Sequence, residues 1–437
     1  MKLGLIAMSG VRVQDAELME LGLTLPGFVE RSRVIASLPS LSLLTLAGLT
    51  PRTVDLAYIE IPDLEKLDDL PGEFDVVAIS SFTAQIKDAY KLADRYRRAG
   101  TRVILGGLHV TALPDEASQH ADSIVLGEAE PVWERLVDDL QQDMLQAIYD
   151  SRETSFDLRF APMPRFDLLD IDRYNRLTVQ TQRGCPFSCE FCASSIQISP
   201  KFKVKPVEKV IAEIRNIKQI WQNPFIEFAD DNTFANKAHG KRLLKDLAKE
   251  GVRWFTETDI SVADDEDLLS LMRDAGCTQL LIGLEAPDRK GLEGVETRSN
   301  WKAKRADKYL EAIGKIQQHG ITVNGCFILG LDGQDGESFD NIVRFVRQSA
   351  LYEVQVTLQT PFPGTQLRRR LASEGRLLEK DAWEKCTLFD ATFSPQSMSV
   401  NELQQRFRTL VEELYTAEFT RWRRGEFRRR QKSLRPH

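Results

Sequence analysis

The sequence predicts an α/β protein that begins with a doubly wound parallel sheet, continues into a partial TIM barrel of six βα units and ends in a helical C-terminal segment. Two observations lead to this prediction. Short apolar runs alternate with amphipathic helical stretches along most of the chain, and such alternation is typical of parallel sheets covered by helices. With 437 residues, the chain is also long enough for two or three domains.

A connector divides the two expected sheets. Pro162, Pro164 and Arg165 lie in a stretch without a clear hydrophobic period, which is typical of an irregular segment on the surface. We therefore expect a first domain over residues 1–150, a linker over 151–175, a barrel domain over 176–365 and the C-terminal segment over 366–437.

The first domain is expected to contain five strands and two main helices. The strands are expected at Leu3–Met8, Val54–Ile61, Val76–Ser80, Val103–Leu105 and Ser123–Leu126. The helices are expected at Leu41–Leu49, which Pro51 stops, and at Gln85–Arg98. The long connection Val11–Ser40 carries Glu30, Arg31 and Arg33, and either a ligand-side loop or a surface loop fits it.

Six strands separated by helices are expected in the barrel domain. The strands are expected at Thr178–Gln182, Phe225–Ala229, Arg253–Glu257, Gln279–Leu284, Thr322–Ile328 and Val354–Gln359. The helices between them are expected at Val207–Ile220, His239–Glu250, Asp265–Asp274, Lys302–His319 and Ser338–Ala350. Functional groups of such barrels lie at the carboxyl ends of the strands.

The C-terminal segment is expected to hold one long helix that starts near Glu402. Its apolar residues recur at helical spacing and predict a packed face. These residues are Leu403, Phe407, Leu410, Leu414 and Phe419. Beyond the helix lies a run rich in arginine, from Arg421 to Lys432. We expect the side chains of this run to be exposed to solvent. The alternative is that the run contacts an anionic lipid surface or a partner.

Composition narrows the function classes. The formal net charge of −7 argues against a general nucleic-acid binder, and six cysteines in so long a chain indicate a reducing, cytoplasmic compartment. The apolar start Met1–Met8 is too short for a signal peptide. The apolar region Val34–Leu49 is too short to span a bilayer, so we expect a buried helix there, with contact to a membrane surface as the minor alternative.

Three cysteines form the motif on which the functional prediction depends. Cys185, Cys189 and Cys192 follow a C-x-x-x-C-x-x-C spacing, with Gly184 and Pro186 suited to a tight loop. A [4Fe–4S] cluster normally takes four cysteines, so three thiolates would leave one iron open for a ligand. A zinc site would need a fourth ligand and a disulfide framework an oxidising compartment, so both are weaker interpretations.

The other cysteines, Cys277, Cys326 and Cys386, are isolated in sequence. Cys277 and Cys326 lie in apolar strand contexts, and we expect both to act as small buried hydrophobes.

Small or acidic residues follow several of the expected strands. They are Ser80-Ser81, Gly106-Gly107-Leu108-His109, Gly127-Glu128-Ala129-Glu130, Asp230-Asp231, Glu257 and Glu285. Paired glycines let a backbone approach a bulky ligand, and carboxylates bind positively charged groups.

The cysteine motif resembles the signature of the radical S-adenosylmethionine (SAM) superfamily, and the motifs of the first domain resemble its subgroup with an N-terminal cobalamin-binding-type domain. The resemblance implies a [4Fe–4S] cluster on the three cysteines, SAM on the open iron, and cobalamin. It implies SAM contacts for Phe191, Asp230, Asp231, Glu285 and Ile328. It implies cobalamin contacts for Ser80, Ser81, Gly106, Gly107 and His109. The D-x-H-x-x-G motif that binds cobalt elsewhere is absent, as is common in this subgroup.

What the resemblance implies is a radical SAM enzyme that cleaves SAM to a 5′-deoxyadenosyl radical and, with cobalamin, methylates an unactivated carbon of a small-molecule substrate. A reducing partner such as flavodoxin or ferredoxin would supply electrons. Radical cyclisation, rearrangement or carbon–heteroatom bond formation without methyl transfer is the close alternative. A non-catalytic iron–sulfur carrier or sensor is the alternative from another class. The sequence identifies no catalytic acid or base.

Overall fold

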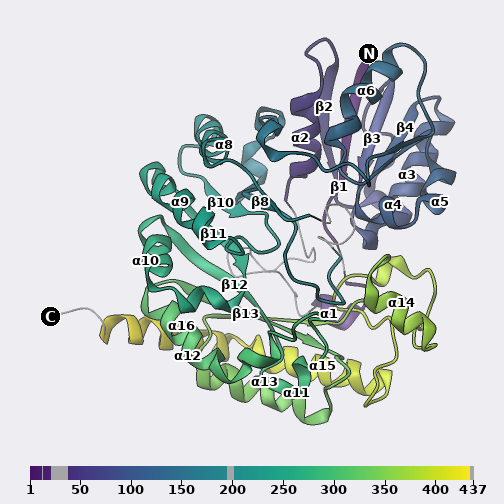
Figure 1. Ribbon diagram of the computed structural model, residues 1–437. Helices are drawn as coiled ribbons and strands as arrows, with labels where there is room; N and C mark the ends of the chain where they lie inside the picture. Colours follow the sequence, from purple (N-terminus) through teal and green to yellow (C-terminus); the bar gives the residue numbers. More distant parts are fainter. Residues whose placement is uncertain (12, 21–37, 194–200, 434–437) are drawn as a thin grey trace.

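Two six-stranded parallel sheets follow one another along the chain and form the upper and lower parts of the molecule in Figure 1. The computed structural model describes residues 1–11, 13–20, 38–193 and 201–433. The strand order is β2-β1-β3-β4-β5-β6 in the first sheet and β14-β13-β12-β11-β10-β7 in the second. The predicted α/β class, with a doubly wound sheet before a partial barrel, is confirmed.

The first sheet contains one strand more than predicted. Its strands are β1 (Lys2–Met8), β2 (Asp55–Ile61), β3 (Val76–Ser80), β4 (Arg102–Gly106), β5 (Ser123–Leu126) and β6 (Ile148–Asp150). The first five agree with the predicted strands to within one residue. β6 pairs with β5 from Ile124 to Leu126, and its three residues are too few to carry an alternating pattern.

Helices cover both faces of the first sheet. They are α2 (Leu41–Leu49), α3 (Ile86–Arg98), α4 (Leu108–Ala112), α5 (Pro114–Ala117) and α6 (Glu130–Gln141). The short helix α1 (Ala16–Glu20) instead packs Leu18 into the core of the second sheet. Because side chains alternate along a strand, Ile6 of β1 packs into the core beside α3, whereas Leu5 packs into the core beside α2 and α6. The helix predicted at α2 is confirmed. Residues 34–37 and the loop residues Glu30, Arg31 and Arg33 lie outside the described residues.

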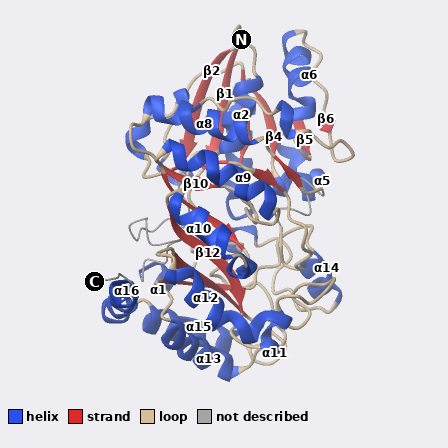
Figure 2. Ribbon diagram, turned by 60° about the vertical axis from the view of Figure 1, so that its left-hand side comes forward, coloured by secondary structure: helices blue, strands red, loops and turns tan. Residues whose placement is uncertain are grey.

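The second sheet is a curved row of six strands with helices on its outer side, and Figure 2 shows α9, α10 and α12 in front of the strands they cover. The strands are β7 (Leu177–Val179), β10 (Phe225–Phe228), β11 (Arg253–Thr258), β12 (Cys277–Glu285), β13 (Thr322–Leu329) and β14 (Glu353–Leu358). The helices are α8 (Val207–Ile220), α9 (Lys237–Leu247), α10 (Glu266–Asp274), α11 (Arg289–Leu292), α12 (Tyr309–Gln318), α13 (Gly336–Ser349) and α14 (Gln366–Ser373). The predicted helix Lys302–His319 is a 3₁₀ turn over Ala303–Lys308 followed by α12.

The first barrel strand differs from the prediction. The expected strand Thr178–Gln182 is broken into β7 and β8 (Gln182–Arg183), and β8 pairs antiparallel with β9 (Lys203–Val204). The reason is the carboxylate of Asp230, which accepts the backbone N–H groups of Thr181 at 2.8 Å and Gln182 at 3.0 Å. These N–H groups are therefore withdrawn from the sheet, and the chain turns toward the cysteine loop.

After α14, the described part of the C-terminal segment forms two further helices, α15 (Val400–Leu414) and α16 (Ala417–Ser433). The packed face predicted for the first is confirmed up to Leu414, and Phe419 belongs to the second. The expectation that the arginine-rich run is solvated is wrong for one face of it, because Arg423 and Phe427 are buried. Among the described residues, no helix is both long and apolar enough to cross a bilayer.

The turn after β5 gives a test of this packing. Gly127 has φ +82°, and a Cβ there would lie 2.9 Å from Ser151 Oγ and 3.0 Å from Arg152 N. Gly100 has φ +85°, but a Cβ there would meet nothing within 4 Å. Both changes to alanine cost about 1 kcal/mol of backbone strain, and only Gly127→Ala adds a clash. We expect Gly127→Ala to lower the urea midpoint of unfolding more than Gly100→Ala does. Equal midpoints would contradict this packing.

Candidate functional site

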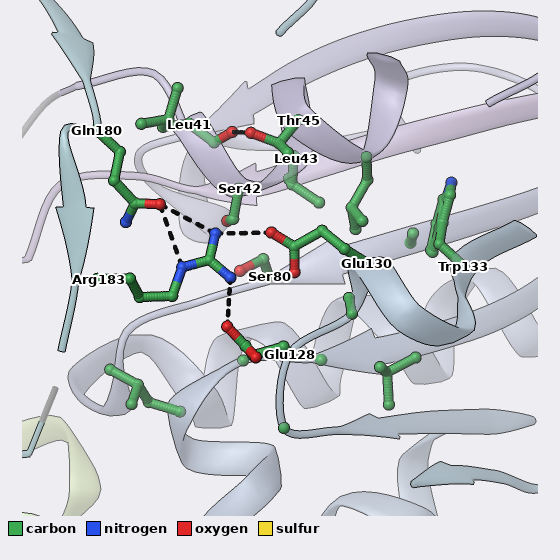
Figure 3. A pocket seen from close by; sticks show the side chains of 18 of the residues that line it. Leu41, Ser42, Leu43, Thr45, Ser80, Glu128, Glu130, Trp133, Gln180 and Arg183 are labelled. Carbon is green, nitrogen blue, oxygen red and sulfur yellow. Dashed lines mark hydrogen bonds and ion pairs between the residues drawn. The ribbon is translucent and has the colours of Figure 1, made fainter. Parts of the chain in front are cut away.

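A cavity of about 340 Å³ lies between the carboxyl edge of the first sheet and the beginning of the second (Figure 3). Its size is in the range of pockets that hold small organic ligands. The first sheet contributes the ends of β3, β4 and β5, together with residues of α2 and α6. The second part of the chain contributes Gln180, Gln182, Arg183, Gly184, Ala229 and Asp231. The cavity is therefore built jointly by both halves of the molecule.

Three residues assigned to cobalamin from the sequence line this cavity, namely Ser80, Gly106 and Gly107. Gly107 has φ +118°, a conformation that glycine adopts without strain. A Cβ at Gly107 would lie 3.6 Å from Ser80 Oγ and 3.9 Å from the carbonyl oxygen of Ser81. This part of the wall is therefore mainly backbone, so a bulky ligand can approach the main chain closely.

His109, which was expected to contact cobalamin, is not among the residues that line this cavity, and that contact stays a prediction. Its buried ring has Nε2 3.2 Å from Glu116 Oε1 and packs edge-on against Trp383, with ring centroids 5.2 Å apart. Trp383 Nε1 donates to the other oxygen of Glu116 at 3.1 Å. Burial lowers the pKa of His109. The residue thus anchors the C-terminal segment on the first domain.

Arg183 crosses the cavity wall between the two sheets, as Figure 3 shows. Its Nη1 donates to Glu128 Oε1 at 2.6 Å, and its Nη2 donates to Glu130 Oε1 at 2.7 Å. Gln180 Oε1 accepts from Nε at 3.1 Å. Lys203 Nζ lies 2.6 Å from both oxygens of Glu128. The loop after β5 is therefore tied to the residue that directly precedes Gly184 and Cys185.

This network is nearly closed to solvent. The side chains of Arg183, Glu128 and Glu130 are 18%, 2% and 8% exposed. Burial opposes the charge of Glu128, but the hydrogen bonds from Lys203, the Phe156 N–H and Arg183 outweigh it and lower its pKa. Glu130 and Glu128 likewise raise the pKa of Arg183 against the effect of burial. Glu128 and Arg183 are therefore both charged at neutral pH.

The cysteine loop is fixed from two sides. On one side, the N–H of Thr297 donates to Ser188 O at 2.9 Å. On the other side, Arg370 of α14 forms a two-point contact with the carboxylate of Glu190, at 2.7 Å and 3.0 Å. Such paired guanidinium–carboxylate contacts fix geometry as well as charge. The loop is thus held in shape by segments that lie far from it in the sequence.

The three motif thiols lie close enough to affect one another electrostatically. Burial raises the pKa of Cys185 to about 11, with Asp231 and Cys192 adding to the rise. Burial raises the pKa of Cys189 to about 12, and both other cysteines contribute. A bound metal deprotonates a coordinating thiol outright. The three cysteines therefore lie near one another on one loop, and their role as cluster ligands stays a prediction.

Aromatic rings of the loop anchor it to the protein. Phe187 stacks on Trp301, with ring centroids 4.6 Å apart. Phe191, which was expected near SAM, is partly buried and packs against an apolar cluster. That cluster consists of Leu367, Leu371 and Phe393. The ring of Phe191 therefore joins the loop to α14, and a contact with SAM stays a prediction.

Asp230 and Asp231 lie in different surroundings, although both were assigned to SAM. The buried carboxylate of Asp230 accepts four hydrogen bonds of 2.5–3.0 Å, from the N–H groups of Thr181 and Gln182 and the hydroxyls of Thr181 and Thr233. These donors occupy the roughly four acceptor positions of a carboxylate. Burial still raises its pKa to about 6. Asp231 lines the cavity and is only partly buried.

Glu285 ends β12 in the left-handed region, with φ +62°. Its carboxylate forms a buried ion pair with Lys302, and Lys302 Nζ also donates to Gly283 O at 2.8 Å. The lysine lies close enough to Cys189 to influence the charge of that thiol. Glu285 is therefore near the cysteine loop and paired with Lys302, and its contact with SAM stays a prediction.

The inner side of the barrel is more polar than predicted. Cys326 was expected in the apolar core, but burial and the carboxylates Glu285 and Glu257 raise its pKa well above the usual range. Loss of solvent inside the barrel and neighbouring carboxylates also raise the pKa of Glu257 to about 8, although its side chain keeps an exposed surface. Ile328 follows Cys326 on the same, partly exposed face. Cys277 is in the outer core, as expected.

The sequence did not identify the contacts of Arg183 with Glu128 and Glu130 as part of the site. We call these contacts the charged bridge. Arg183 stands directly before Gly184 and Cys185, and Glu128 and Glu130 stand directly after β5. The position of the charged Arg183 next to the cysteine loop was the one feature of the sequence that pointed to its role. Which charges meet could not be read from the sequence, because Arg183 and Glu128 are separated by 55 residues.

Comparisons with known proteins agree with this geometry. Residues 179–346 match the family model of the radical SAM superfamily, and residues 39–137 match that of the B12-binding domain. Residues 365–434 match a domain of unknown function, DUF4070. Bacteriochlorophyllide d C-8(2)-methyltransferase of Chlorobaculum tepidum is 30% identical over 366 residues, which cover 78% of either chain.

The chain belongs to the radical SAM superfamily, in the subgroup with a B12-binding domain. Another relative of this radical SAM enzyme is bacteriochlorophyllide d C-12(1)-methyltransferase of Chlorobaculum tepidum, 28% identical over 86% of this chain and 82% of the relative. The solved structure of the methyltransferase TsrM from Kitasatospora setae, with cobalamin and a [4Fe–4S] cluster bound, has the same fold. Its TM-score is 0.68 at 14% identity, over 99% of both chains.

The cofactors of this radical SAM enzyme are a [4Fe–4S] cluster, SAM and cobalamin. The residues present fit all three. The thiols of Cys185, Cys189 and Cys192 would hold the cluster, and Asp231 offers a carboxylate at the adjoining cavity. Gly106 and Gly107 line the same cavity, where cobalamin would bind.

The contrast between the two aspartates gives a prediction. If Asp231 accepts hydrogen bonds from the ammonium group of SAM, Asp231→Asn should weaken SAM binding by roughly 10- to 100-fold, the value of a charge-assisted hydrogen bond. Its unfolding midpoint should change less than that of Asp230→Asn. Asp230→Asn should lower the unfolding midpoint instead, because its amide nitrogen cannot accept from the two hydroxyls, of Thr181 and Thr233, that donate to Oδ2 of the aspartate. Isothermal titration of cluster-loaded enzyme with SAM and urea unfolding measure the two effects. An unchanged SAM affinity in Asp231→Asn would contradict this role.

Proposed function

We propose that the enzyme uses its cavity to methylate an unactivated carbon of a small-molecule substrate. The observation that carries the proposal is the joint lining of one cavity by the Gly106–Gly107 wall and by Arg183–Gly184, next to Cys185. A cobalamin on the first wall and a SAM beside the cysteine loop would then face the same space. When bound, the cluster supplies the electron that cleaves SAM, and methylcobalamin supplies the methyl group.

The residues of the chain position these groups and exclude water. The three cysteines hold the cluster, Asp231 binds the ammonium group of SAM, and backbone at Gly106 and Gly107 supports the corrin. Arg183 fixes the distance between the two walls. Because positioning of reactants can account for much of an enzymatic rate, a rigid connection between the two cofactor sites favours transfer over side reactions.

A tetrapyrrole is the first substrate class to test. Two relatives are named as methyltransferases of bacteriochlorophyllide d, and the alignments cover at least 78% of this chain and of each relative. We further propose that a small electron-transfer protein such as flavodoxin or ferredoxin reduces the enzyme in the cytoplasm. The net charge of −7 supports the absence of a nucleic-acid substrate.

The stoichiometry of the products tests the reaction. Each methyl transfer should consume two SAM molecules and two electrons: one SAM yields methionine and 5′-deoxyadenosine, and the other yields S-adenosylhomocysteine. Reduced enzyme loaded with cluster and cobalamin is incubated with methyl-deuterated SAM and bacteriochlorophyllide d. We expect 5′-deoxyadenosine and S-adenosylhomocysteine in equal amounts. We also expect the deuterated methyl group on the tetrapyrrole.

Two variants control this experiment. Cys189→Ala should lose the cluster absorbance and all formation of 5′-deoxyadenosine, whereas Cys277→Ala, in the outer core, should keep both. Formation of 5′-deoxyadenosine without S-adenosylhomocysteine would contradict methylation and favour a radical rearrangement or cyclisation. An intact cluster without any cleavage of SAM would favour an electron carrier.

A further inference from the structure

Helix α16 presents two different faces along its length. Phe419, Arg423 and Phe427 recur every four residues and are buried, as expected for one face of a helix. The opposite face carries Arg421, Arg428, Arg429 and Lys432, all exposed. We call these four residues the basic stripe. It is a positively charged surface, in which Arg429 also pairs with Glu426, on a chain whose net charge is −7.

The buried face fixes this helix firmly on the barrel. The ring of Phe427 packs edge-on against Tyr352, with centroids 5.2 Å apart, and Arg424 Nε donates to Glu353 at 2.7 Å. Gln431 donates to the backbone oxygen of Gln317. The basic stripe is therefore displayed by a rigid element and does not depend on a solvated tail.

An exposed tryptophan adjoins the basic stripe. Trp422 is 39% exposed, and its ring stacks on that of Phe419 with centroids 5.4 Å apart and an interplanar angle of 4°. Tryptophan beside lysine and arginine on an exposed helical face is typical of proteins that rest on a membrane surface, where the indole sits at the headgroup level.

The position of α16 argues against a redox partner as the occupant. The helix contacts Glu353, the first residue of β14, so it lies at the amino end of the barrel, and Figure 1 shows it along the lower edge of the molecule. The cysteine loop lies beyond the carboxyl ends of the strands. Strands of six to nine residues separate the two ends by roughly 20–30 Å, which is too far for a donor seated on α16 to approach the cluster.

We propose that the basic stripe and Trp422 dock the enzyme onto an anionic membrane surface. The inference is independent of the reaction proposed above. Each lysine or arginine near an anionic leaflet strengthens binding by about five-fold, so four side chains on one face are enough for reversible attachment. Because charge drives the contact, attachment should weaken as salt rises.

Co-sedimentation with vesicles tests the proposal. The full chain is mixed with vesicles of phosphatidylcholine alone and with vesicles that also contain phosphatidylglycerol. We expect binding only to the second kind, and at least a 20-fold loss of affinity in the stripe variant Arg421→Glu/Arg428→Glu/Lys432→Glu. The matched control Lys66→Glu/Lys91→Glu/Arg98→Glu changes the net charge equally at exposed positions of the first domain and should retain binding.

A second readout locates the contact. Brominated phosphatidylcholine in the anionic vesicles should quench the fluorescence of the wild-type protein, and Trp422→Phe should lose most of this quenching while it still sediments with the vesicles. Failure of the wild-type chain to bind anionic vesicles, or equal binding by the stripe variant and the control, would overturn the proposal. Stripe-dependent binding of duplex DNA or RNA without vesicle binding would overturn it as well.

Discussion

The guanidinium of Arg183 lies between Glu128 and Glu130, and this buried contact is the point at which the two sheets become one site. Charges removed from water are costly unless they are paired, and removal of one partner from such a pair typically costs about 3–5 kcal/mol. Here the pair joins the first sheet to the loop that carries the cysteines. If the two moved apart, these charges would become exposed or would lose their partners. The geometry of the cavity therefore depends on this contact.

Besides the contacts of Arg183 with Glu128 and Glu130, further contacts hold the cysteine loop in place. Asp230 holds the start of the loop through Thr181 and Gln182, and Arg370 holds its middle through Glu190. A site that joins a cluster, SAM and cobalamin must keep their reactive atoms in register, and rigid supports achieve this better than mobile loops. The polar inner face of the barrel, with the ion pair of Glu285 and Lys302, then continues the site away from the cobalamin wall.

Sequence patterns predicted the fold because most elements carry a strong local signal. α2, for example, lies between a serine cap and a proline, and β3 is a run of apolar residues that ends in Ser80. The elements that differ depend on contacts distant in sequence: Asp230 breaks the first barrel strand, and Glu353 and Tyr352 draw the arginine-rich run onto the barrel. The cysteine motif was legible because its ligands are local. The role of Arg183 and the different surroundings of Asp230 and Asp231 could not be predicted from the sequence, because they depend on ion pairing and burial in the folded chain.

The central claim is that one cavity unites the cluster with cobalamin, and cobalt content tests it most directly. The full chain is reconstituted without oxygen with iron, sulfide and hydroxocobalamin, then desalted, and cobalt and iron are quantified beside the absorbance spectrum. The account predicts cobalt in a stoichiometric amount together with an intact cluster. A complete cluster without bound cobalt would contradict it, because the Gly106–Gly107 wall would then serve as a scaffold or a substrate platform.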